Sequence, residues 1–527
     1  MLTKLIRACT QVRRFTNKII MNRTYESAIK ALNTLQSNSS VLKEVSRSNQ
    51  IHQNDRFEKA KEFCVRAKVP IDELDMLKAI HVSGTKGKGS VCAFCDRILR
   101  EHGLKTGFYS SPHLVEVRER IRIDGKLISK EKFAHYFWTS WDNLQQACAN
   151  DMPSYFVFLT IMSFYIFLHE KIDVAIIEVG IGGAYDTTNI LRRPWVCGVT
   201  LLGRDHLTVL GGTTESIAWN KAGIFKCSVP AFTVPQDEIS MKVLSQRAKE
   251  LKAPLKVVPK MCDYPGEMIT KLGIEGQHQF QNASLAAQLC HTWLQRNWEE
   301  NNCENRSNEI FSDTPTASGV ITVAETFPIS GTFRNALEKT YWPGRSHCIS
   351  RENYSLYLDG AHTPKSILAS AVWFRKRADE EKYLLSPRKV FRVLIFNCTD
   401  LVLYQLIFKK SSDLSDFTHS LSSTLKRCHE NHEIWKRLTG EKDSVLLSLN
   451  DLDKRFRTMA VPTSSVVTSV SEALNFVLGE RELSLRINAD SSRISPRADH
   501  VQVVITGSLH LVGAAMKVLG PNLVKIQ

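Results

Sequence analysis

The stretch HVSGTKGKGS, residues 81–90, constrains this chain more than any other part of it. A run typical of a β-strand, 77–82, leads into it, and a helical pattern follows from residue 91. Glycines let backbone N–H groups close around an anion, the start of a helix adds the positive end of its dipole, and a lysine adds a full charge. Strand, glycine loop and helix therefore predict a cradle for the phosphates of a nucleoside triphosphate. The loop residues assigned to that role are Gly84, Thr85, Lys86, Gly87, Lys88, Gly89 and Ser90.

The loop departs from the commonest phosphate-binding pattern, G-x-x-x-x-G-K-[ST]. That pattern needs a glycine at position 82 and a serine or threonine at 89, where this chain has Val82 and Gly89. The hydroxyl that usually binds Mg²⁺ directly after the lysine is missing, so a metal ion needs ligands from elsewhere. Ser90 is placed to cap the helix that follows and to reach phosphate. The alternative is a glycine-rich surface turn that binds nothing.

Apolar strands alternate with helical patterns along most of the chain. The first series of expected strands is 77–82, 106–109, 173–179, 195–201 and 231–234, and the second is 354–358, 390–396 and 501–505. Apolar strands that alternate with helices form parallel sheets covered on both faces. The sequence therefore predicts two α/β domains, 21–340 with the phosphate loop and a smaller one at 341–527. The polar stretch 301–318 is expected to be a disordered insertion.

Charge separates the first twenty residues from the rest. The chain has a formal net charge of +15, and no acidic residue precedes Glu26. The basic residues of this segment are Lys4, Arg7, Arg13, Arg14 and Lys18. With Leu, Ile and Phe interspersed, residues 1–20 are typical of a mitochondrial presequence, and a disordered basic tail is the alternative. Met21 follows directly, and a second translation start there would give a cytoplasmic form.

Two classes of partner are disfavoured by the sequence. Its longest apolar run, 155–168, is about 14 residues and is interrupted by Thr160 and Ser163, so it predicts a buried helix and not a membrane span. The basic charge comes without a nucleic-acid-binding motif, which favours small anionic ligands over nucleic acid.

Acidic residues follow two of the apolar strands. Glu178 lies at the end of strand 173–179, and Asp205 and His206 come after the strand that ends near Leu202. The carboxyl ends of parallel strands meet at one edge of the sheet, where ligands bind. A buried acid at that edge needs a cation, and Mg²⁺ is a natural one. A structural salt bridge and a structural histidine are the alternatives.

Long motifs carry a resemblance to a known family. They are GTKGKGS, GLKTGFYSSPHLVEVRERIRIDG, IEVGIGGAYDTTNI, DHLTVLGG, KAGIFK, YWPGR, YLDGAH and TGSLHLVG. In these motifs the chain resembles the folylpolyglutamate synthases of the Mur-ligase superfamily, from about residue 21 to about 520, most weakly over 291–325 and 400–500. The resemblance implies a P-loop, parallel-sheet ATPase domain and a smaller, Rossmann-like C-terminal α/β domain.

The resemblance also implies a set of metal ligands and catalytic residues. Ser111, Glu178 and His206 match the family's protein ligands to Mg²⁺. Lys221 matches a lysine that the family carbamylates, and a carbamate there would bridge a second Mg²⁺. An ordinary lysine paired with phosphate is the alternative. Lys88, His206 and Lys221 are then the expected catalytic residues.

Nucleotide and substrate contacts are implied in the same way. Asn282, Arg345 and Asp359 are expected to bind ATP. The residues expected to bind the folate and the incoming glutamate are Pro112, His113, His362 and Ser508. Arg118, Arg120 and Arg122 recur at every second position, which predicts one face of a strand, either attracting folate carboxylates or simply solvated.

The implied reaction is ATP-dependent γ-glutamylation of tetrahydrofolates through an acyl phosphate, by a monomer, with two Mg²⁺ ions, a possible monovalent cation and a possible peripheral association with the mitochondrial inner membrane. A bifunctional enzyme that also makes dihydrofolate is the second hypothesis. A catalytically impaired binding protein is the third, because FNCT, residues 396–399, continues as DLVLYQLIFKKSS where the family has G-D-R-D-P. The arginine of that segment is associated with glutamate binding.

Overall fold

The computed structural model describes residues 23–36, 50–148, 151–302, 321–397, 469–478 and 499–520. The chain divides into two compact units. The larger unit comprises Met1–Pro112, Arg118–Val258 and Leu285–Ala324, and the smaller comprises His113–Val117, Pro259–Ser284 and Glu325–Gln527. The predicted two-part α/β architecture is confirmed, while the domain boundary placed at residue 340 from the sequence stays a prediction. Residues 1–20 and nearly all of 301–318 lie outside the described residues.

The larger unit is built on a mixed sheet with strand order β4-β3-β2-β5-β1-β6-β7-β8. Six strands are parallel: β1 (Ile80–Ser83), β2 (Thr106–Tyr109), β5 (Val174–Glu178), β6 (Val196–Val199), β7 (Ala231–Thr233) and β8 (Leu255–Val257). Two short strands, β3 (Ile121–Ile123) and β4 (Lys126–Leu127), extend one edge in antiparallel pairing. This antiparallel edge was not predicted from the sequence, because a two- or three-residue strand leaves almost no pattern.

Helices cover both faces of this sheet, and alternate residues of the strands show which helix covers which face. Gly198 of β6 packs against Leu289 of α11 (Gln277–Asn302), whereas its neighbour Cys197 belongs to a core formed with α9 (Thr214–Ala222) and α10 (Glu238–Glu250). On β2, Thr106 bonds Asp96 of α5 (Lys88–Glu101), while Gly107 packs against Phe167 of α7 (Tyr155–Glu170). The helices α5 and α11 therefore cover one face, and α7, α9 and α10 the other.

The remaining elements of the larger unit lie outside this three-layer core. They are α2 (Tyr25–Thr34), α4 (Gln50–Arg66), η1 (Ile71–Leu77), η2 (Val117–Arg120), α6 (Lys130–Ala147), η3 (Thr187–Ile190) and α8 (Leu207–Leu210). Among the first described residues, Arg23 pairs with Asp142 at 2.6 Å and lies over the ring of Trp138.

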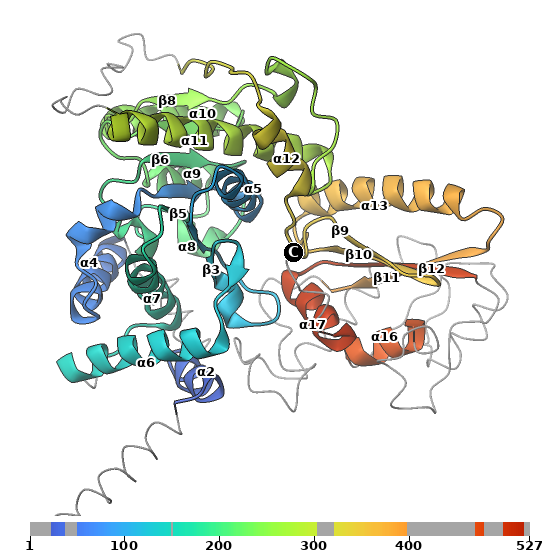
Figure 1. The fold of residues 1–527 in the computed structure, drawn as a ribbon, viewed down its shortest axis with the longest axis horizontal. Helices are drawn as coiled ribbons and strands as arrows, with labels where there is room; N and C mark the ends of the chain where they lie inside the picture. The colour runs from blue at the N-terminus through green and yellow to red at the C-terminus, as the bar shows by residue number, and fades with distance from the viewer. Residues whose placement is uncertain are drawn as a thin grey trace, which may run out of the picture. The chain divides into compact units, whose positions relative to one another are not determined.

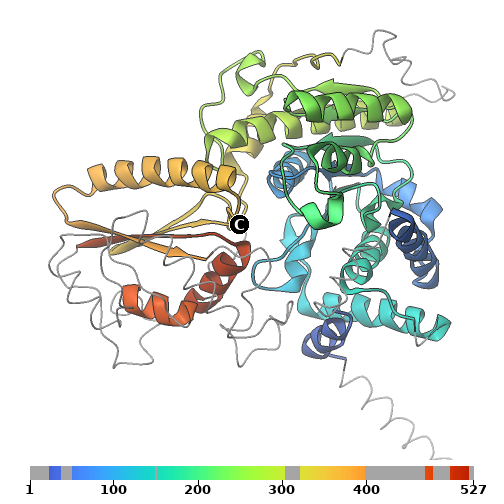
Figure 2. The ribbon, with the colours of Figure 1, turned by 180° about the vertical axis from the view of Figure 1, so that it is seen from behind.

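The smaller unit is a four-stranded sheet with order β11-β12-β10-β9. Its strands are β9 (His347–Ser350), β10 (Tyr354–Asp359), β11 (Val390–Phe396) and β12 (His500–Thr506), with β9 antiparallel to β10 and the others parallel. Its helices are α12 (Gly331–Lys339), α13 (Pro364–Leu384), α16 (Val470–Leu478), α17 (Leu509–Leu519) and the short η4 (Met261–Asp263). Tyr357 packs on Trp373 of α13, whereas Leu356 and Leu358 join the core made with α16 and α17, so the helices take opposite faces (Figures 1 and 2).

Two local predictions are wrong. Arg118, Arg120 and Arg122 do not share a strand face, because the first two lie in η2 and only Arg122 lies in β3. Arg120 and Arg122 are buried, which also excludes the solvated face. Residues 301 and 302 end α11 and are not part of a disordered insertion. Within the described residues, no helix is long and apolar enough to span a membrane.

Candidate active site

The glycine loop lies where the sequence predicts it, at the carboxyl edge of the parallel sheet. Strand β1 ends at Ser83, and α5 begins at Lys88 with Gly87 as its N-cap. Gly87 has φ 98°, a conformation that favours glycine. The first turn of a helix has N–H groups without acceptors inside the helix, so this one is suited to an anion. Ser90 does not cap the helix, contrary to the prediction, because it already lies within the first turn.

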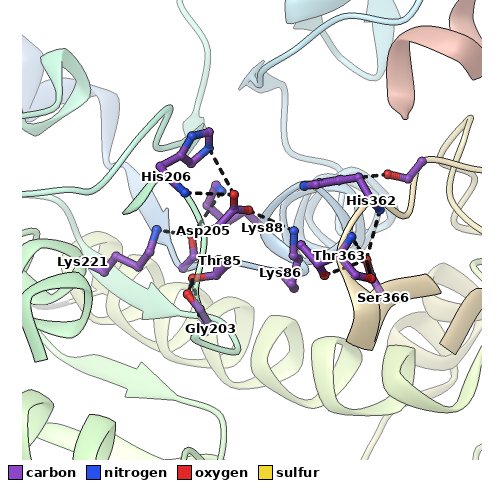
Figure 3. Close-up of polar contacts among 12 residues, drawn as sticks. Thr85, Lys86, Lys88, Gly203, Asp205, His206, Lys221, His362, Thr363 and Ser366 are labelled. Carbon is purple, nitrogen blue, oxygen red and sulfur yellow. Dashed lines mark hydrogen bonds and ion pairs between the residues drawn. The ribbon is translucent and has the colours of Figure 1, made fainter. Parts of the chain in front are cut away.

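Gly84 is required by its surroundings and organises two lysines. It has φ 139°, and a Cβ at this position would overlap the Thr200 hydroxyl and lie 2.9 Å from the Thr200 backbone nitrogen. The Gly84 carbonyl accepts a hydrogen bond from Lys88 Nζ at 3.1 Å and one from Lys221 Nζ at 2.8 Å (Figure 3). Two of the predicted catalytic residues, 133 positions apart in sequence (221 − 88), thus converge on one oxygen.

Lys221 is unusual because its side chain is almost fully buried near the end of α9. Burial lowers the pKa of Lys221 well below the ordinary value, and the charge of Lys88 adds to this effect. A lysine in this environment carries a neutral, nucleophilic amine much more readily than an exposed one. The lowered pKa favours the neutral amine that the predicted carbamylation would need.

His206 lies next to this pair of lysines, in the segment that follows β6. Its neighbour Asp205 pairs with Lys86 of the glycine loop, with 3.0 Å between Nζ and Oδ2. Partial burial lowers the pKa of His206, and the nearby lysines add to this while Asp205 opposes it. The His206 side chain is 49% exposed, so solvent weakens these effects. A lowered pKa favours the neutral imidazole, which is the form that binds metal ions.

Glu178 and Ser111 are brought together at the ends of two neighbouring strands. Glu178 is the buried last residue of β5, and its Oε2 accepts the Ser111 N–H at 3.2 Å. Ser111 is followed by Pro112 through a cis peptide bond. The buried carboxylate of Glu178 thus lies next to the backbone of Ser111, at the ends of two neighbouring strands. The described part of the chain contains no group of three or more His, Cys, Asp or Glu side chains that could share a metal ion. The metal ligands expected from the sequence are of another kind, because they include a serine and a lysine.

A buried hydrogen-bonded chain behind the loop was not predicted. Thr188 donates its hydroxyl to Asp186 at 2.6 Å and lies 2.9 Å from Nε2 of His81, which is fully buried on β1. Since the one hydrogen of Thr188 goes to Asp186, His81 Nε2 must be the donor, which fixes its tautomer. Burial lowers the pKa of His81 to about 3, with a further contribution from Lys226. These residues lie within sequence motifs described above, but no feature of the sequence indicates that they contact one another.

The smaller unit gathers three residues that the sequence assigned to ATP. Asn282 Nδ2 donates to Gln279 Oε1 at 2.8 Å, and Gln279 lies 3.1 Å from His278, whose imidazole is an electrostatic neighbour of Arg345 and Asp359. Asp359 accepts the Ser346 N–H at 2.7 Å and the Ala361 N–H at 2.9 Å, so both of its oxygens hold local backbone. Gln279 and His278 are further candidates that the sequence reasoning missed.

Two of the residues expected to bind substrates make polar contacts with residues close to them in sequence. His113 is buried, and His362 Nδ1 lies 3.1 Å from the Gly360 carbonyl (Figure 3). Ser508 is the N-cap of α17 and accepts the His510 N–H at 3.1 Å. That bond uses an oxygen lone pair, so the Ser508 hydroxyl keeps its hydrogen for a further acceptor.

The sheet, the glycine loop and the lysines at its carboxyl edge, one of them buried, define a phosphate-binding α/β unit of the kind used by nucleotide-dependent enzymes. A Bos taurus protein named "Folylpolyglutamate synthase, mitochondrial" is 38% identical over 95% of this chain and 93% of its own length. A Homo sapiens protein of the same name is 39% identical over 95% and 92%. The chain belongs to the folylpolyglutamate synthase family, and it is a ligase.

Solved structures agree on the fold. A complex described as FPGS with AMPPCP has a TM-score of 0.59 and 20% identity, and it covers 93% of this chain and 98% of its own. A bifunctional folylpolyglutamate synthase/dihydrofolate synthase with Mn, AMPPNP and L-glutamate has a TM-score of 0.54 and 22% identity, with coverage of 88% and 94%. No family model matches the chain.

Proposed function

We propose that this chain uses ATP to join L-glutamate to reduced folates through γ-linked amide bonds. The relatives named folylpolyglutamate synthase support the substrates, and the neighbour bound to AMPPCP supports the nucleotide. The observation that carries the proposal is the Gly84 carbonyl, which accepts both Lys88 and Lys221 at the edge of the sheet that also holds Glu178. Positive charge and a buried acid meet there, as phosphoryl transfer requires.

The reaction proceeds in two chemical steps. The γ-phosphoryl group of ATP passes to the terminal carboxylate of the folate, which forms an acyl phosphate and releases ADP. The α-amine of glutamate then attacks the acyl carbon, the bond to phosphate breaks, and the amine loses a proton as the amide forms. Lys88 and the amides at the start of α5 neutralise charge on the transferring group. The site must exclude water, since the acyl phosphate would otherwise hydrolyse.

Divalent metal ions fit the residues present. The Ser111 hydroxyl, the Glu178 carboxylate and a neutral His206 would hold one ion, and hard oxygen ligands are those that Mg²⁺ prefers. Glu178 is buried and lies directly beside Ser111, an arrangement that a cation would stabilise. A bound ion would neutralise charge on the phosphates. We place a second ion on Lys221 in its carbamylated form, for which the burial and the lowered pKa of its amine provide support.

The other residues assigned from the sequence keep their proposed roles. Asn282, Arg345 and Asp359 are proposed to bind the nucleotide, and the electrostatic proximity of Arg345 and Asp359 to His278 supports this grouping. Pro112, His113, His362 and Ser508 contact the folate and the incoming glutamate. The relatives named as mitochondrial support targeting by residues 1–20. We also infer a cytoplasmic form from Met21, a monomer, binding of a monovalent cation and peripheral association with the inner membrane.

One observation favours a second function. The segment after FNCT departs from the family pattern at 400–412, which lies outside the described residues. Arg392 does not replace the missing arginine, because it pairs with Asp379 at 2.6 Å and bonds Gln502 at 2.9 Å. A chain without an arginine for the glutamate carboxylate would bind nucleotide and folate but transfer glutamate slowly.

One assay separates these functions and the bifunctional alternative. The purified chain is incubated with ATP, Mg²⁺ and labelled glutamate, with either tetrahydrofolate or dihydropteroate as acceptor, and Lys88→Ala is the control. Labelled tetrahydrofolate product that disappears with Lys88→Ala supports the proposal. Product from dihydropteroate as well indicates the bifunctional enzyme. AMPPCP binding without product from either acceptor refutes glutamate ligation and supports the binding protein.

A further inference from the structure

The glycine loop is fastened to the segment that follows β6, residues 201–206. The Leu201 carbonyl accepts the N–H groups of Thr85 at 3.1 Å and Lys86 at 3.0 Å. The Thr85 hydroxyl donates to the Gly203 carbonyl at 3.1 Å and accepts the Gly203 N–H at 3.1 Å. These backbone and hydroxyl contacts hold the two segments side by side (Figure 3). The segment that carries His206 therefore moves with the phosphate loop.

Asp205 adds a charged connection between the same two segments. Its Oδ2 pairs with Lys86 Nζ at 3.0 Å, and its Oδ1 accepts the His206 N–H at 3.0 Å. The side chains of Lys86 and Asp205 are 28% and 20% exposed, so solvent screens this pair less than a surface pair. One carboxylate thus holds the phosphate loop with one oxygen and the backbone of His206 with the other.

His206 needs such support because of its own conformation. It has φ 51°, in the left-handed region that a residue with a Cβ adopts unfavourably. The bond from its N–H to Asp205 is a local interaction of the kind that stabilises this region. The His206 carbonyl accepts the N–H groups of Val209 and Leu210 at 3.0 Å, so α8 holds that side of the residue. Asp205 holds the other side through the His206 N–H, and we expect loss of this carboxylate to loosen the backbone there and to change the direction of the imidazole.

We infer that Lys86 and Asp205 form a positioning pair for His206, in which the Lys86 ammonium is held by Asp205 and does not bind phosphate. The inference rests on the proposed metal role of His206, and it changes the role that the sequence assigned to Lys86. Lys88 and Lys221, in contrast, direct their ammonium groups to the Gly84 carbonyl inside the loop. The pair is electrically neutral, so it orients the metal ligand without adding charge toward the nucleotide.

A double-mutant cycle distinguishes a Lys86 that positions His206 through Asp205 from a Lys86 that binds phosphate. The variants are Lys86→Met, which keeps the stem, Asp205→Asn, which keeps the shape, and the two together, with Lys86→Arg as a matched control that retains the charge. Binding of AMPPCP is measured without metal and with increasing Mg²⁺, and thermal unfolding checks that each variant is folded. Because residues that orient metal ligands typically contribute about 10- to 100-fold to metal affinity, we expect each single change to raise the Mg²⁺ requirement at least about tenfold.

A positioning pair predicts that the double variant is no worse than either single variant and that Lys86→Arg is close to the unsubstituted chain. It also predicts that metal-free AMPPCP affinity changes less than about twofold in Lys86→Met, since a phosphate contact is not lost. If Lys86→Met lowers the metal-free affinity for AMPPCP about tenfold or more, both in the unsubstituted chain and in Asp205→Asn, Lys86 is a phosphate ligand and the inference is overturned. Binding of AMPPCP without glutamate ligation refutes the proposed function and still leaves this cycle decisive, whereas a chain that does not bind AMPPCP refutes both.

Discussion

Gly84→Ala tests whether the shape of the phosphate loop depends on one missing side chain. Two penalties are expected. A residue with a Cβ is disfavoured at φ 139°, by about 1–2 kcal/mol on the scale of left-handed conformations. The Cβ would also overlap the Thr200 hydroxyl, and overpacking of this kind typically destabilises by about 1–3 kcal/mol. The free energy of unfolding should therefore fall by about 2–5 kcal/mol.

The functional effect should be larger than the loss of stability alone suggests. The Gly84 carbonyl accepts both Lys88 and Lys221, so a displaced loop moves both ammonium groups. A displacement of about 1 Å in a positioned catalytic group costs on the order of 100-fold in rate, and we expect a loss of at least that size in ligase turnover.

Gly103→Ala is the matched control, because Gly103 also has positive φ, 80°, but a Cβ there would meet nothing within 4 Å. It should show the conformational penalty alone, with turnover preserved. Adding Thr200→Ala to Gly84→Ala should recover part of the stability by removing the overlapping hydroxyl. Urea unfolding and initial rates measure both effects. Equal unfolding free energies and equal turnover for Gly84→Ala and Gly103→Ala would refute the account of this loop.

Three further outcomes are expected. Lys88→Ala should abolish turnover while the thermal midpoint measured by calorimetry stays nearly unchanged, because its ammonium contacts a loop carbonyl and not the core; loss of folding would contradict a mainly catalytic role. For His81, whose pKa is lowered from 6.5 to about 3 on folding, the unfolded chain binds the extra proton below pH 6.5. Stability should therefore fall by about 2 kcal/mol from pH 7 to pH 5 on account of this group, and urea unfolding of His81→Gln should lack that part of the loss. Chelation of divalent ions should stop turnover reversibly without unfolding, and Glu178→Gln should raise the Mg²⁺ concentration needed for AMPPCP binding; an unchanged requirement would exclude Glu178 as a ligand.

Much of the fold could be predicted, because buried parallel strands and the glycine loop leave strong local patterns. Strands 106–109 and 390–396 agree with the structure to the residue. The strand before the loop was placed three residues too early, since η1 extends to Leu77 and Lys78 turns the chain with φ 45°. The start of α5 was placed three residues too late, because its first turn contains Gly89, and glycine disfavours a helix.

The candidate site, like the fold, could be predicted only in part. The family resemblance grouped Ser111 with Glu178, and the structure brings the two residues together because β2 and β5 are neighbouring parallel strands. The chain from Asp186 to His81 was not predictable, since it links positions 105 residues apart (186 − 81) through the register of β1 against β5. The arginines at 118–122 were misplaced because a period of two resembles a strand even when a 3₁₀ turn interrupts it.

The acyl phosphate is the central claim of this account, and isotope transfer tests it most directly. Tetrahydrofolate carrying ¹⁸O in its terminal carboxylate is incubated with ATP, Mg²⁺ and glutamate, and the phosphate released is analysed by mass spectrometry. Because the carboxylate oxygen bonds to phosphorus in the first step and leaves with it in the second, the account predicts one ¹⁸O in each phosphate formed with product. Glutamylated folate accompanied by phosphate without ¹⁸O would contradict it.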